Sequence, residues 1–271
     1  MLDAIVAARR QAVAADKKRR PLAALRPAIA PGTGAFAAAL RANAWSLIAE
    51  CKLASPAKGT LCDRYTVPEL AGLYTRGGAA ALSVHTSPPF RGRLEDLAAV
   101  RAVSPLPILR KDFIIDEYQL YESRWAGADA VLLIARILTD DQLGRFLALA
   151  GDLGLDCLVE VHSREELDRV QRTPAAIVGL NNRDLRTFTT DLAATFAMLP
   201  HIDSRRLVIS ESGINDGRDA LKLKQAGLRG ALVGEGLVTA PDIAARTREL
   251  ALAAAASAPD RQTIKGGQPH A

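Results

Sequence analysis

The sequence predicts an α/β fold, a (β/α)8 TIM barrel, from three observations. Eight short apolar runs recur between residues 46 and 234. The segments between them place apolar residues at helical spacing, and several start with Thr, Ser, Asn or Asp and finish near Gly, as helices do. All eight repeats fit within about 200 residues, which suits a closed barrel. Runs that are apolar on both faces and alternate with helices indicate a parallel sheet covered by helices.

A helical extension precedes the first predicted strand. Residues 1–20 fit one weakly amphipathic helix, because apolar residues recur at Leu2, Ile5, Val6 and Val13. Two prolines and two glycines within residues 26–34 end this helix. Residues 35–43 predict a second, short helix. We therefore expect residues 1–45 to form an N-terminal helical extension.

The barrel itself is expected over residues 46–250. Its strands are predicted at residues 46–51, 79–84, 107–110, 130–135, 157–161, 176–180, 207–210 and 230–234. Helices are predicted at residues 66–78, 116–128, 139–154, 163–172, 215–227 and 240–250. An open doubly wound sheet is the alternative, but no GxGxxG motif follows the first strand. Residues 251–271 lose all periodicity and predict a flexible C-terminal tail.

The composition disfavours several classes of function. A net charge of +5 suits an anionic ligand, but basic residues cluster only at residues 17–20 and aromatic residues make up 4%, so we expect no nucleic-acid partner. No apolar run approaches the roughly 18 residues of a membrane span, and no apolar signal region begins the chain, so we expect a cytoplasmic protein. The three cysteines form no CxxC pair, which predicts buried thiols at Cys51 and Cys157 rather than disulfides or a zinc site.

Polar residues mark six of the eight predicted strand ends. In strand order these are Glu50 and Lys52, Arg110 and Lys111, Glu160, Asn181 with Asn182 and Arg183, Ser210 with Glu211 and Ser212, and Glu235 after Gly234. A parallel barrel directs all its strand carboxyl ends to one face, where the active sites of this fold lie. Charged groups embedded there are costly unless they are paired or used. One such residue could be a surface charge, but six strand ends together predict an active site.

The last two strand ends predict a phosphate site. "SESGI" and "LVGEGL" place Gly213, Gly234 and Gly236 beside short helices. Backbone N–H groups at helix starts favour a dianion, and these two loops are the usual place for phosphate in this fold. Turn glycines without a ligand are the alternative.

Lys52 and Lys111 could serve two chemistries. A barrel lysine can form a Schiff base, or it can stay an ammonium that donates a proton or binds an anion, and spacing alone leaves both open. No cluster of His, Cys and carboxylate residues suggests a metal. His162 stands two residues after Glu160, but it also borders the next helix, so we expect a cap or solvent role for it. The role of His85 stays ambiguous.

Sequence motifs along the whole chain match one known family. Residues 48–59, "IAECKLASPAKG", are similar to its first-strand motif, and residues 107–134 are similar to its most characteristic block. "VEVH", "VGLNNRDL", "SESGI" and "LVGEGL" match its remaining strand ends in order. Residues 2–26 are similar to its extra helical segment, which covers the barrel mouth. From Leu2 to Leu250 the chain resembles the indole-3-glycerol phosphate synthase family of tryptophan biosynthesis.

The resemblance implies a decarboxylating and dehydrating ring closure. The substrate would be 1-(2-carboxyphenylamino)-1-deoxyribulose 5-phosphate, a small molecule with two anionic ends, and the product indole-3-glycerol phosphate. No cofactor and no metal are implied. We expect a monomer or a weak dimer, and the extension, residues 1–45, is expected to pack on the barrel mouth.

The resemblance also implies a role for each matching residue. Lys111 would be the general acid, and Glu160 its carboxylate counterpart in proton transfer during dehydration. Lys52 would hold the anthranilate carboxylate and share proton donation, and Glu50 would orient both lysines. The remaining implied residues position or bind the substrate: Asn181, Ser212, Glu211 and Arg183 beside it, Ser55, Gly213 and Gly234 around the phosphate, and Phe90 on the anthranilate ring.

Four residues depart from the pattern of the family. Leu53 stands where Arg is usual, Ala57 where Ser is usual, Arg93 where Ser is frequent, and Glu235 where Ser is common. A carboxylate would repel phosphate, so we expect Glu235 to contribute only its backbone or to point away.

Three alternatives stay open at this point. One is a Schiff-base aldolase of the same fold that uses Lys111 or Lys52. Another is a phosphoribosyl anthranilate isomerase, although such enzymes usually need a Cys/Asp pair at strand ends and no predicted strand ends in Asp. The third is a polyanion-binding protein that uses residues 17–20, which would leave the polar strand ends unexplained.

Overall fold

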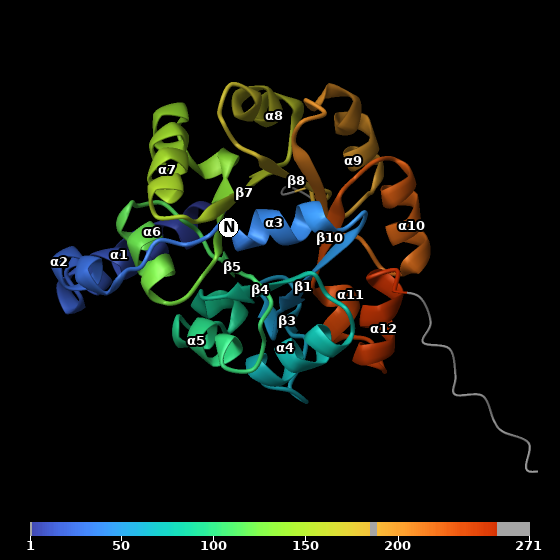
Figure 1. The fold of residues 1–271 in the computed structure, drawn as a ribbon, viewed down its shortest axis with the longest axis horizontal. Helices are drawn as coiled ribbons and strands as arrows, with labels where there is room; N and C mark the ends of the chain where they lie inside the picture. Colours follow the sequence, from blue (N-terminus) through green and yellow to red (C-terminus); the bar gives the residue numbers. More distant parts are fainter. Residues whose placement is uncertain (1, 185–188, 254–271) are drawn as a thin grey trace, which may run out of the picture.

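Eight parallel strands close into a barrel in the computed structural model, which describes residues 2–184 and 189–253 (Figure 1). The strands follow one another around the barrel in the order β1-β10-β9-β8-β7-β6-β5-β4. Their bounds are β1 Ser46–Cys51, β4 Ala81–His85, β5 Ile108–Lys111, β6 Ala130–Ile134, β7 Asp156–Val161, β8 Ile177–Asn181, β9 Leu207–Glu211 and β10 Gly230–Val233. The predicted (β/α)8 barrel is confirmed, and each predicted strand lies within two residues of an observed one.

Helices surround the barrel and connect its strands (Figure 1). They are α4 Val67–Arg76, α5 Glu95–Arg101, α6 Tyr118–Trp125, α7 Asp140–Asp152, α8 Arg164–Gln171, α9 Ala193–Met198, α10 Gly217–Gln225, α11 Glu235–Val238 and α12 Ile243–Leu250. Side-chain caps start several of them: Thr139 accepts a hydrogen bond from the N–H of Gln142, and Asp216 accepts from the N–H groups of Arg218 and Asp219. Such caps satisfy backbone donors that have no partner within the helix.

Two apolar layers hold the barrel together. The inner layer fills its interior and includes Ile48, Leu109, Leu158 and Ile209. The outer layer lies between strands and helices. Because successive side chains on a strand point to opposite faces, each strand contributes to both layers. At the carboxyl ends the same alternation decides which polar residues enter the barrel mouth.

The N-terminal extension consists of α1 Leu2–Arg19, α2 Leu22–Leu25, a 3-10 turn and α3 Ala35–Ala42. Helix α3 crosses the barrel at its amino end (Figure 1), where Phe36 and Leu40 are buried in the inner layer. The backbone N–H of Ala37 donates to Asp156, at the start of β7, over 2.8 Å. Helix α1 lies toward the opposite end, where Arg9 pairs with Asp112 and Lys17 with Asp116 in the loop after β5. The extension is therefore divided between both ends of the barrel and not packed wholly on the mouth, because α3 carries the apolar face that closes the interior.

A short hairpin follows β1, formed by β2 Ala54–Ser55 and β3 Gly59–Thr60. Its turn needs a left-handed residue, and Gly59 adopts a φ of 67° there. Most of the predicted tail, from residue 254 on, lies outside the described residues. Within residues 2–184 and 189–253, no helix is long and apolar enough to cross a membrane.

Candidate active site

The carboxyl ends of the strands surround a cavity of about 670 Å³. Three residues of α1, Leu2, Asp3 and Ile5, line it from the N-terminal extension. Every residue predicted to act on substrate also lines it: Glu50, Lys52, Ser55, Phe90, Lys111, Glu160, Asn181, Arg183, Glu211, Ser212, Gly213 and Gly234. The fold thus brings residues from across nearly 200 positions of sequence to one mouth.

Lys111 ends β5 and lies between two carboxylates. Its Nζ donates to Glu160 Oε2 over 2.9 Å and to Glu211 Oε2 over 2.7 Å. Burial alone would lower the pKa of Lys111, but Glu160, Glu211 and Glu50 together raise it above its usual range. The two carboxylates therefore hold Lys111 as an ammonium.

Glu160 and Glu211 compete for the single charge of Lys111. Burial and the nearby charge of Glu160 raise the pKa of Glu211 to about 7, although Lys111 pulls it down. Burial acts in the same direction on Glu160, but the charges of Lys111 and His162 outweigh it and lower the pKa of Glu160 to about 2. Close carboxylates in a dry site avoid double ionisation in this way. At neutral pH Glu160 is an anion, and Glu211 holds a proton part of the time.

A second cluster lies on β1 and β4. Glu50 Oε1 is 2.9 Å from His85 Nε2, and Glu50 Oε2 is 3.9 Å from Lys52 Nζ. Burial opposes the charge on Glu50, yet His85 and Lys52 lower its pKa well below the usual range. The His85 ring stacks on Phe90 with centroids 4.2 Å apart, and Lys52 Nζ lies 5.7 Å from the centroid of Phe90. An aromatic face beside an ammonium suits a ring that carries a carboxylate.

Two glycines make room for the buried carboxylates. A Cβ on Gly234 would overlap Glu50 Oε2, and a Cβ on Gly179 in β8 would overlap Glu211 Oε1. Neither glycine adopts a positive φ. Close approach of a neighbouring side chain, and not backbone conformation, requires glycine at these two positions.

The loops after β1, β9 and β10 form the other end of the cavity. Ser212 and Gly213 both adopt left-handed backbone conformations, with φ of 66° and 75°. Ser55 lies in the hairpin that faces these loops, and Gly234 directly precedes α11. Small residues at this end leave space for an anion, and backbone N–H groups at a helix start can bind a phosphate.

Lys58 and Glu235 bridge this end. Lys58 Nζ donates to Glu235 Oε1 over 2.5 Å, and both residues line the cavity. The expectation that Glu235 offers only its backbone or points away stays a prediction. The structure shows that its carboxylate is neutralised by Lys58 from the hairpin.

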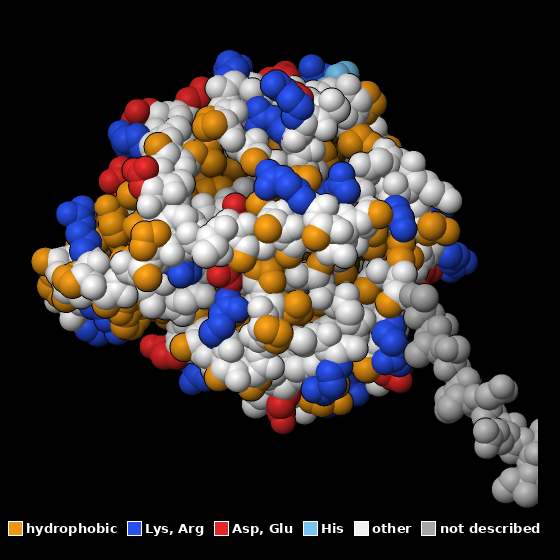
Figure 2. Space-filling model, in the orientation of Figure 1, with side chains coloured by type: hydrophobic (Ala, Val, Ile, Leu, Met, Phe, Trp, Pro, Cys, Tyr) orange, Lys and Arg blue, Asp and Glu red, His pale blue; other side chains and the backbone are white. Residues whose placement is uncertain are grey.

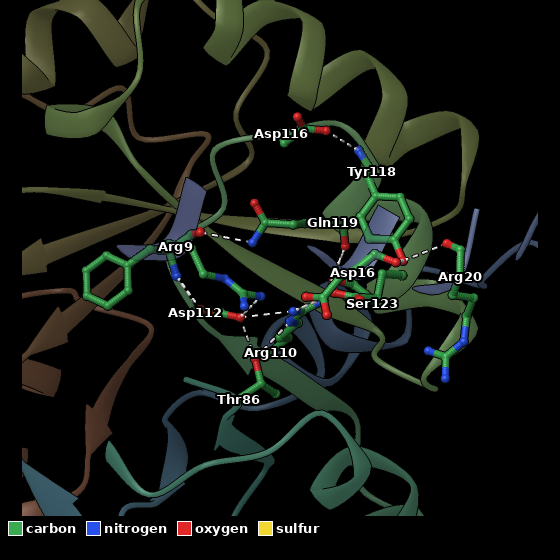
Figure 3. A network of polar contacts seen from close by, with 12 residues as sticks. Arg9, Asp16, Arg20, Thr86, Arg110, Asp112, Asp116, Tyr118, Gln119 and Ser123 are labelled. Atoms are coloured by element: carbon green, nitrogen blue, oxygen red, sulfur yellow. Dashed lines mark hydrogen bonds and ion pairs between the residues drawn. The ribbon is translucent and has the colours of Figure 1, made fainter. Parts of the chain in front are cut away.

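Three polar residues at the strand ends, Arg110, Ser210 and Asn182, point away from the mouth, contrary to the prediction. Arg110 is fully buried outside the barrel, where it donates to Asp112 over 2.9 Å (Figure 3). It also donates to Glu122 over 2.9 Å. Asn182 donates to Ser210 over 2.9 Å beneath α9. Each directly precedes or follows a residue that points inward, so strand alternation turns it outward.

His162 is a cavity residue that the sequence argument missed. Its Nε2 lies 3.3 Å from Glu160 Oε1, its Nδ1 lies 3.6 Å from Glu166 Oε2, and its side chain is 6% exposed. The predicted cap role falls to Ser163, which accepts a hydrogen bond from the N–H of Glu166. The two-residue spacing from Glu160 was the available signal, since it places both side chains on one face. His85, previously ambiguous, lies in the cavity for the same reason, two residues after Ser83.

Figure 3 shows how α1 is fixed beside the cavity. Arg9 Nη2 donates to Asp112 Oδ2 over 2.7 Å, and both side chains are buried. Asp112 directly follows Lys111, and burial opposes the charge of Asp112, but Arg110 and Arg9 lower its pKa. Nothing in the sequence pattern pairs Arg9 with Asp112, which lies 103 positions away.

Comparison with known proteins identifies the family. The model of the indole-3-glycerol phosphate synthase family matches residues 2–250. The chain belongs to the indole-3-glycerol phosphate synthase family. An indole-3-glycerol phosphate synthase of Desulforamulus reducens is 50% identical over 210 residues, 77% of this chain and 79% of that protein. One of Roseiflexus castenholzii is 46% identical over 263 residues, 92% of this chain and 97% of that protein.

Indole-3-glycerol phosphate synthases are carboxy-lyases of tryptophan biosynthesis, so this chain is an enzyme of that class. Among solved structures, 3-hexulose-6-phosphate synthase from Salmonella typhimurium superposes with a TM-score of 0.62 at 16% identity, covering 76% of this chain and 97% of that one. At this identity the likeness concerns the barrel fold alone.

The four departures from the pattern of the synthase family lie in different surroundings. Ala57 and Glu235 line the cavity. Leu53 is half-buried against the outer apolar layer. The side chain of Arg93 is 77% exposed and pairs with Asp96, away from the cavity residues. Ala57 and Glu235 are thus the departures that can touch substrate directly.

Proposed function

We propose that this enzyme closes the indole ring of 1-(2-carboxyphenylamino)-1-deoxyribulose 5-phosphate, releasing carbon dioxide, water and indole-3-glycerol phosphate. The observation that carries the proposal is the ammonium of Lys111, held by Glu160 and Glu211 inside the cavity. A buried proton donor beside two carboxylates of different pKa provides both an acid and a base. Family membership supports the same reaction.

In the first step Lys111 gives its proton to the substrate carbonyl oxygen. The ring carbon that bears the carboxylate attacks the carbonyl carbon, and a new carbon–carbon bond forms. Loss of carbon dioxide then returns its bonding electron pair to the ring and restores aromaticity. A donor is needed because the carbonyl oxygen becomes more basic as the bond forms.

The second step removes water from the five-membered ring. Lys111 first regains a proton from solvent, and the new hydroxyl then leaves as water with that proton; Lys52 can share this role. Glu160 accepts the proton lost from the carbon beside the nitrogen. Because Glu160 has a lowered pKa and lies 2.9 Å from Lys111, the base is already ionised next to the acid.

Substrate binding divides the cavity into two ends. The anthranilate ring would stack on Phe90, with its carboxylate on Lys52 and with Glu50 orienting that lysine. The phosphate would lie between Ser55 of the hairpin and the backbone of Ser212, Gly213 and Gly234, with the nearby guanidinium of Arg183 adding positive charge. Asn181 would hold a substrate hydroxyl from the cavity wall.

The ionisation of Lys111 disfavours the aldolase alternative. A Schiff base requires a neutral amine, and a neighbouring pair of carboxylates stabilises the ammonium instead. We also infer that the enzyme is cytoplasmic, works as a monomer or weak dimer, and has no nucleic-acid or membrane partner.

The reaction can be tested directly with purified enzyme. Incubation with the carboxyphenylamino sugar phosphate should produce indole fluorescence and carbon dioxide in equal amounts. Borohydride added during turnover should leave the protein mass unchanged. A substrate adduct trapped on Lys111 or Lys52, or release of one product without the other, would contradict the proposal.

A further inference from the structure

His162 lies between two carboxylates at the edge of the cavity. Its Nε2 faces Glu160 Oε1 at 3.3 Å, and its Nδ1 faces Glu166 Oε2 at 3.6 Å. The ring is nearly buried, with 6% of its side chain exposed. Each ring nitrogen thus lies within ion-pair distance of a carboxylate, although neither makes a well-aligned hydrogen bond and Nδ1 is a buried atom without a hydrogen-bond partner among the described residues. A doubly protonated imidazole would carry a proton on each nitrogen and a positive charge between the two anions.

The charged groups around the ring are mostly acidic. They come from four other elements besides β7 and are Glu166 of α8, Glu211 of β9, Lys111 of β5 and Arg136 of the 3-10 turn after β6, in addition to Glu160 itself. Burial favours the neutral ring, but Glu166, Glu160 and Glu211 raise the pKa of His162 above its ordinary value. Arg136 pairs with Glu166 and not with the ring, because it lies 3.8 Å from Glu166 Oε1, the oxygen that does not face His162.

Glu166 is itself fixed in place. Its Oε2 accepts a hydrogen bond of 2.8 Å from the backbone N–H of His162, and its N–H donates to Ser163 at the start of α8. The side chain of Glu166 is 11% exposed, so it lies between the buried imidazole ring and the solvent. The helix start thus supplies a rigid outer partner for the imidazole.

We propose that His162 is a positioning residue for Glu160: its protonated imidazole, at ion-pair distance from both Glu166 and Glu160, holds Glu160 ionised and fixes the orientation of its carboxylate. The two oxygens of Glu160 are then divided, with Oε1 on His162 and Oε2 on Lys111. Without the imidazolium, Glu160 and Glu211 would share the charge of Lys111 alone, and Glu160 would bind a proton at higher pH. The inference rests on the proposed function, in which Glu160 accepts a proton.

The first test follows kcat and KM against pH in His162→Ala and His162→Gln, with His201→Gln as control. His201 is exposed in the turn after α9, so its variant should match wild type. In His162→Ala we expect kcat to fall about tenfold near neutral pH and its acid limb to move up by roughly one pH unit, with KM within about twofold.

The Gln variant separates charge from hydrogen bonding. Its amide can still donate to Glu160 but carries no charge, so kcat should recover in part while the acid limb stays shifted. A purely structural role would lower kcat without moving the acid limb. An acid limb that coincides with wild type in both variants would therefore overturn the proposal.

The second test needs no active variant and no turnover. The chain has four histidines, so the imidazole nitrogen resonances of His162 can be assigned by their absence in His162→Gln. In wild type both ring nitrogens should carry protons at pH 7, and Glu160→Gln or Glu166→Gln should each lower the titration midpoint. A neutral ring at pH 7 would overturn the proposal. If wild type makes no indole product, the proposed function fails, while this titration still decides the role of His162.

Discussion

Gly234 lies directly against the carboxylate of Glu50, so close that a Cβ at position 234 would overlap Glu50 Oε2. Glu50 lies on β1 and Gly234 directly follows the neighbouring β10, since β1 pairs with β10 up to Ala49 and Val233. Glu50 in turn holds His85 and Lys52. The absence of a Cβ at Gly234 thus leaves the space that Glu50 needs to keep its contacts with His85 and Lys52.

Gly234→Ala should therefore damage catalysis. The new methyl group forces Glu50 off His85 and Lys52, and we expect kcat/KM to fall at least about tenfold, because misplacing a positioning group by about 1 Å can cost up to a hundredfold. Steady-state assays check this. Gly144→Ala is the matched control, since a Cβ there meets nothing within 4 Å. In α7 it should keep full activity and stabilise the fold by about 0.5 to 1 kcal/mol. Equal activity in both variants would refute the steric account.

Glu211 should make stability depend on pH. Its pKa is raised from 4.5 to about 7 by burial and by Glu160, so the folded chain binds this proton more tightly than the unfolded chain does. The stabilisation is complete below pH 4.5 and is lost as pH rises through 7. Glu211→Gln has no proton to lose at this position, so its stability does not fall over this pH range for that reason. Its free energy of unfolding relative to wild type should rise between pH 5 and pH 8, on the order of 1 to 3 kcal/mol.

Urea denaturation of both proteins across that pH range measures the difference. Glu165→Gln is a suitable control, because Glu165 is exposed in the first turn of α8. Its relative stability should not change over the same pH interval. A flat difference for Glu211→Gln would show that Glu211 ionises at its ordinary pKa.

The fold and the inward residues could be predicted because they follow from periodicity. The recurring apolar runs determine the barrel, and a parallel barrel sends Glu50, Lys111 and Glu160 to one mouth. Residues that alternate outward, such as Arg110 and Asn182, were assigned to the mouth because consecutive polar residues in a sequence do not show which side chain points inward. The strand register and the side-chain χ angles decide the direction of each side chain, and both depend on packing.

Long-range partners could not be predicted from the sequence. Arg9 meets Asp112 only because α1 returns across the mouth, and a hydrophobic pattern does not encode that path. The position of α3 at the opposite end likewise depends on which apolar face fits the barrel interior. The role of His162 could not be predicted because a residue next to a helix start can either cap the helix or face the cavity, and only the structure distinguishes the two, with 6% of its side chain exposed.

Arg9→Met should loosen the N-terminal extension. Asp112 keeps Arg110 as a partner, so we expect a loss of about 1 to 3 kcal/mol in the free energy of unfolding, less than for an orphaned buried charge. KM should rise severalfold, because Leu2 and Ile5 of the same helix line the cavity.

Arg19→Met serves as its control. Arg19 pairs with Asp16 within α1 and its side chain is 71% exposed, so this variant should lose about 0.5 kcal/mol or less. Thermal denaturation and steady-state kinetics on both variants distinguish the two sites. Equal effects of the two substitutions would contradict a special role for the buried pair.

Lys58 and Glu235 should have opposite effects on substrate affinity. In Glu235→Gln the rim loses a negative charge and Lys58 is released toward the phosphate, so KM should fall severalfold. In Lys58→Met the carboxylate of Glu235 stays unpaired beside the phosphate, so KM should rise about tenfold. KM values in the same direction for both variants would show that the pair does not act on the phosphate.

Lys111→Met tests the central claim most directly. The substitution removes the proton donor while keeping an unbranched side chain of similar length, and Lys222→Met on the exposed face of α10 controls for loss of a lysine. In the indole fluorescence assay at saturating substrate, Lys111→Met should lose at least about a hundredfold in kcat, since general acid catalysis contributes that much or more. Lys222→Met should match wild type. Turnover of Lys111→Met at the wild-type rate would contradict the assignment of Lys111 as the acid.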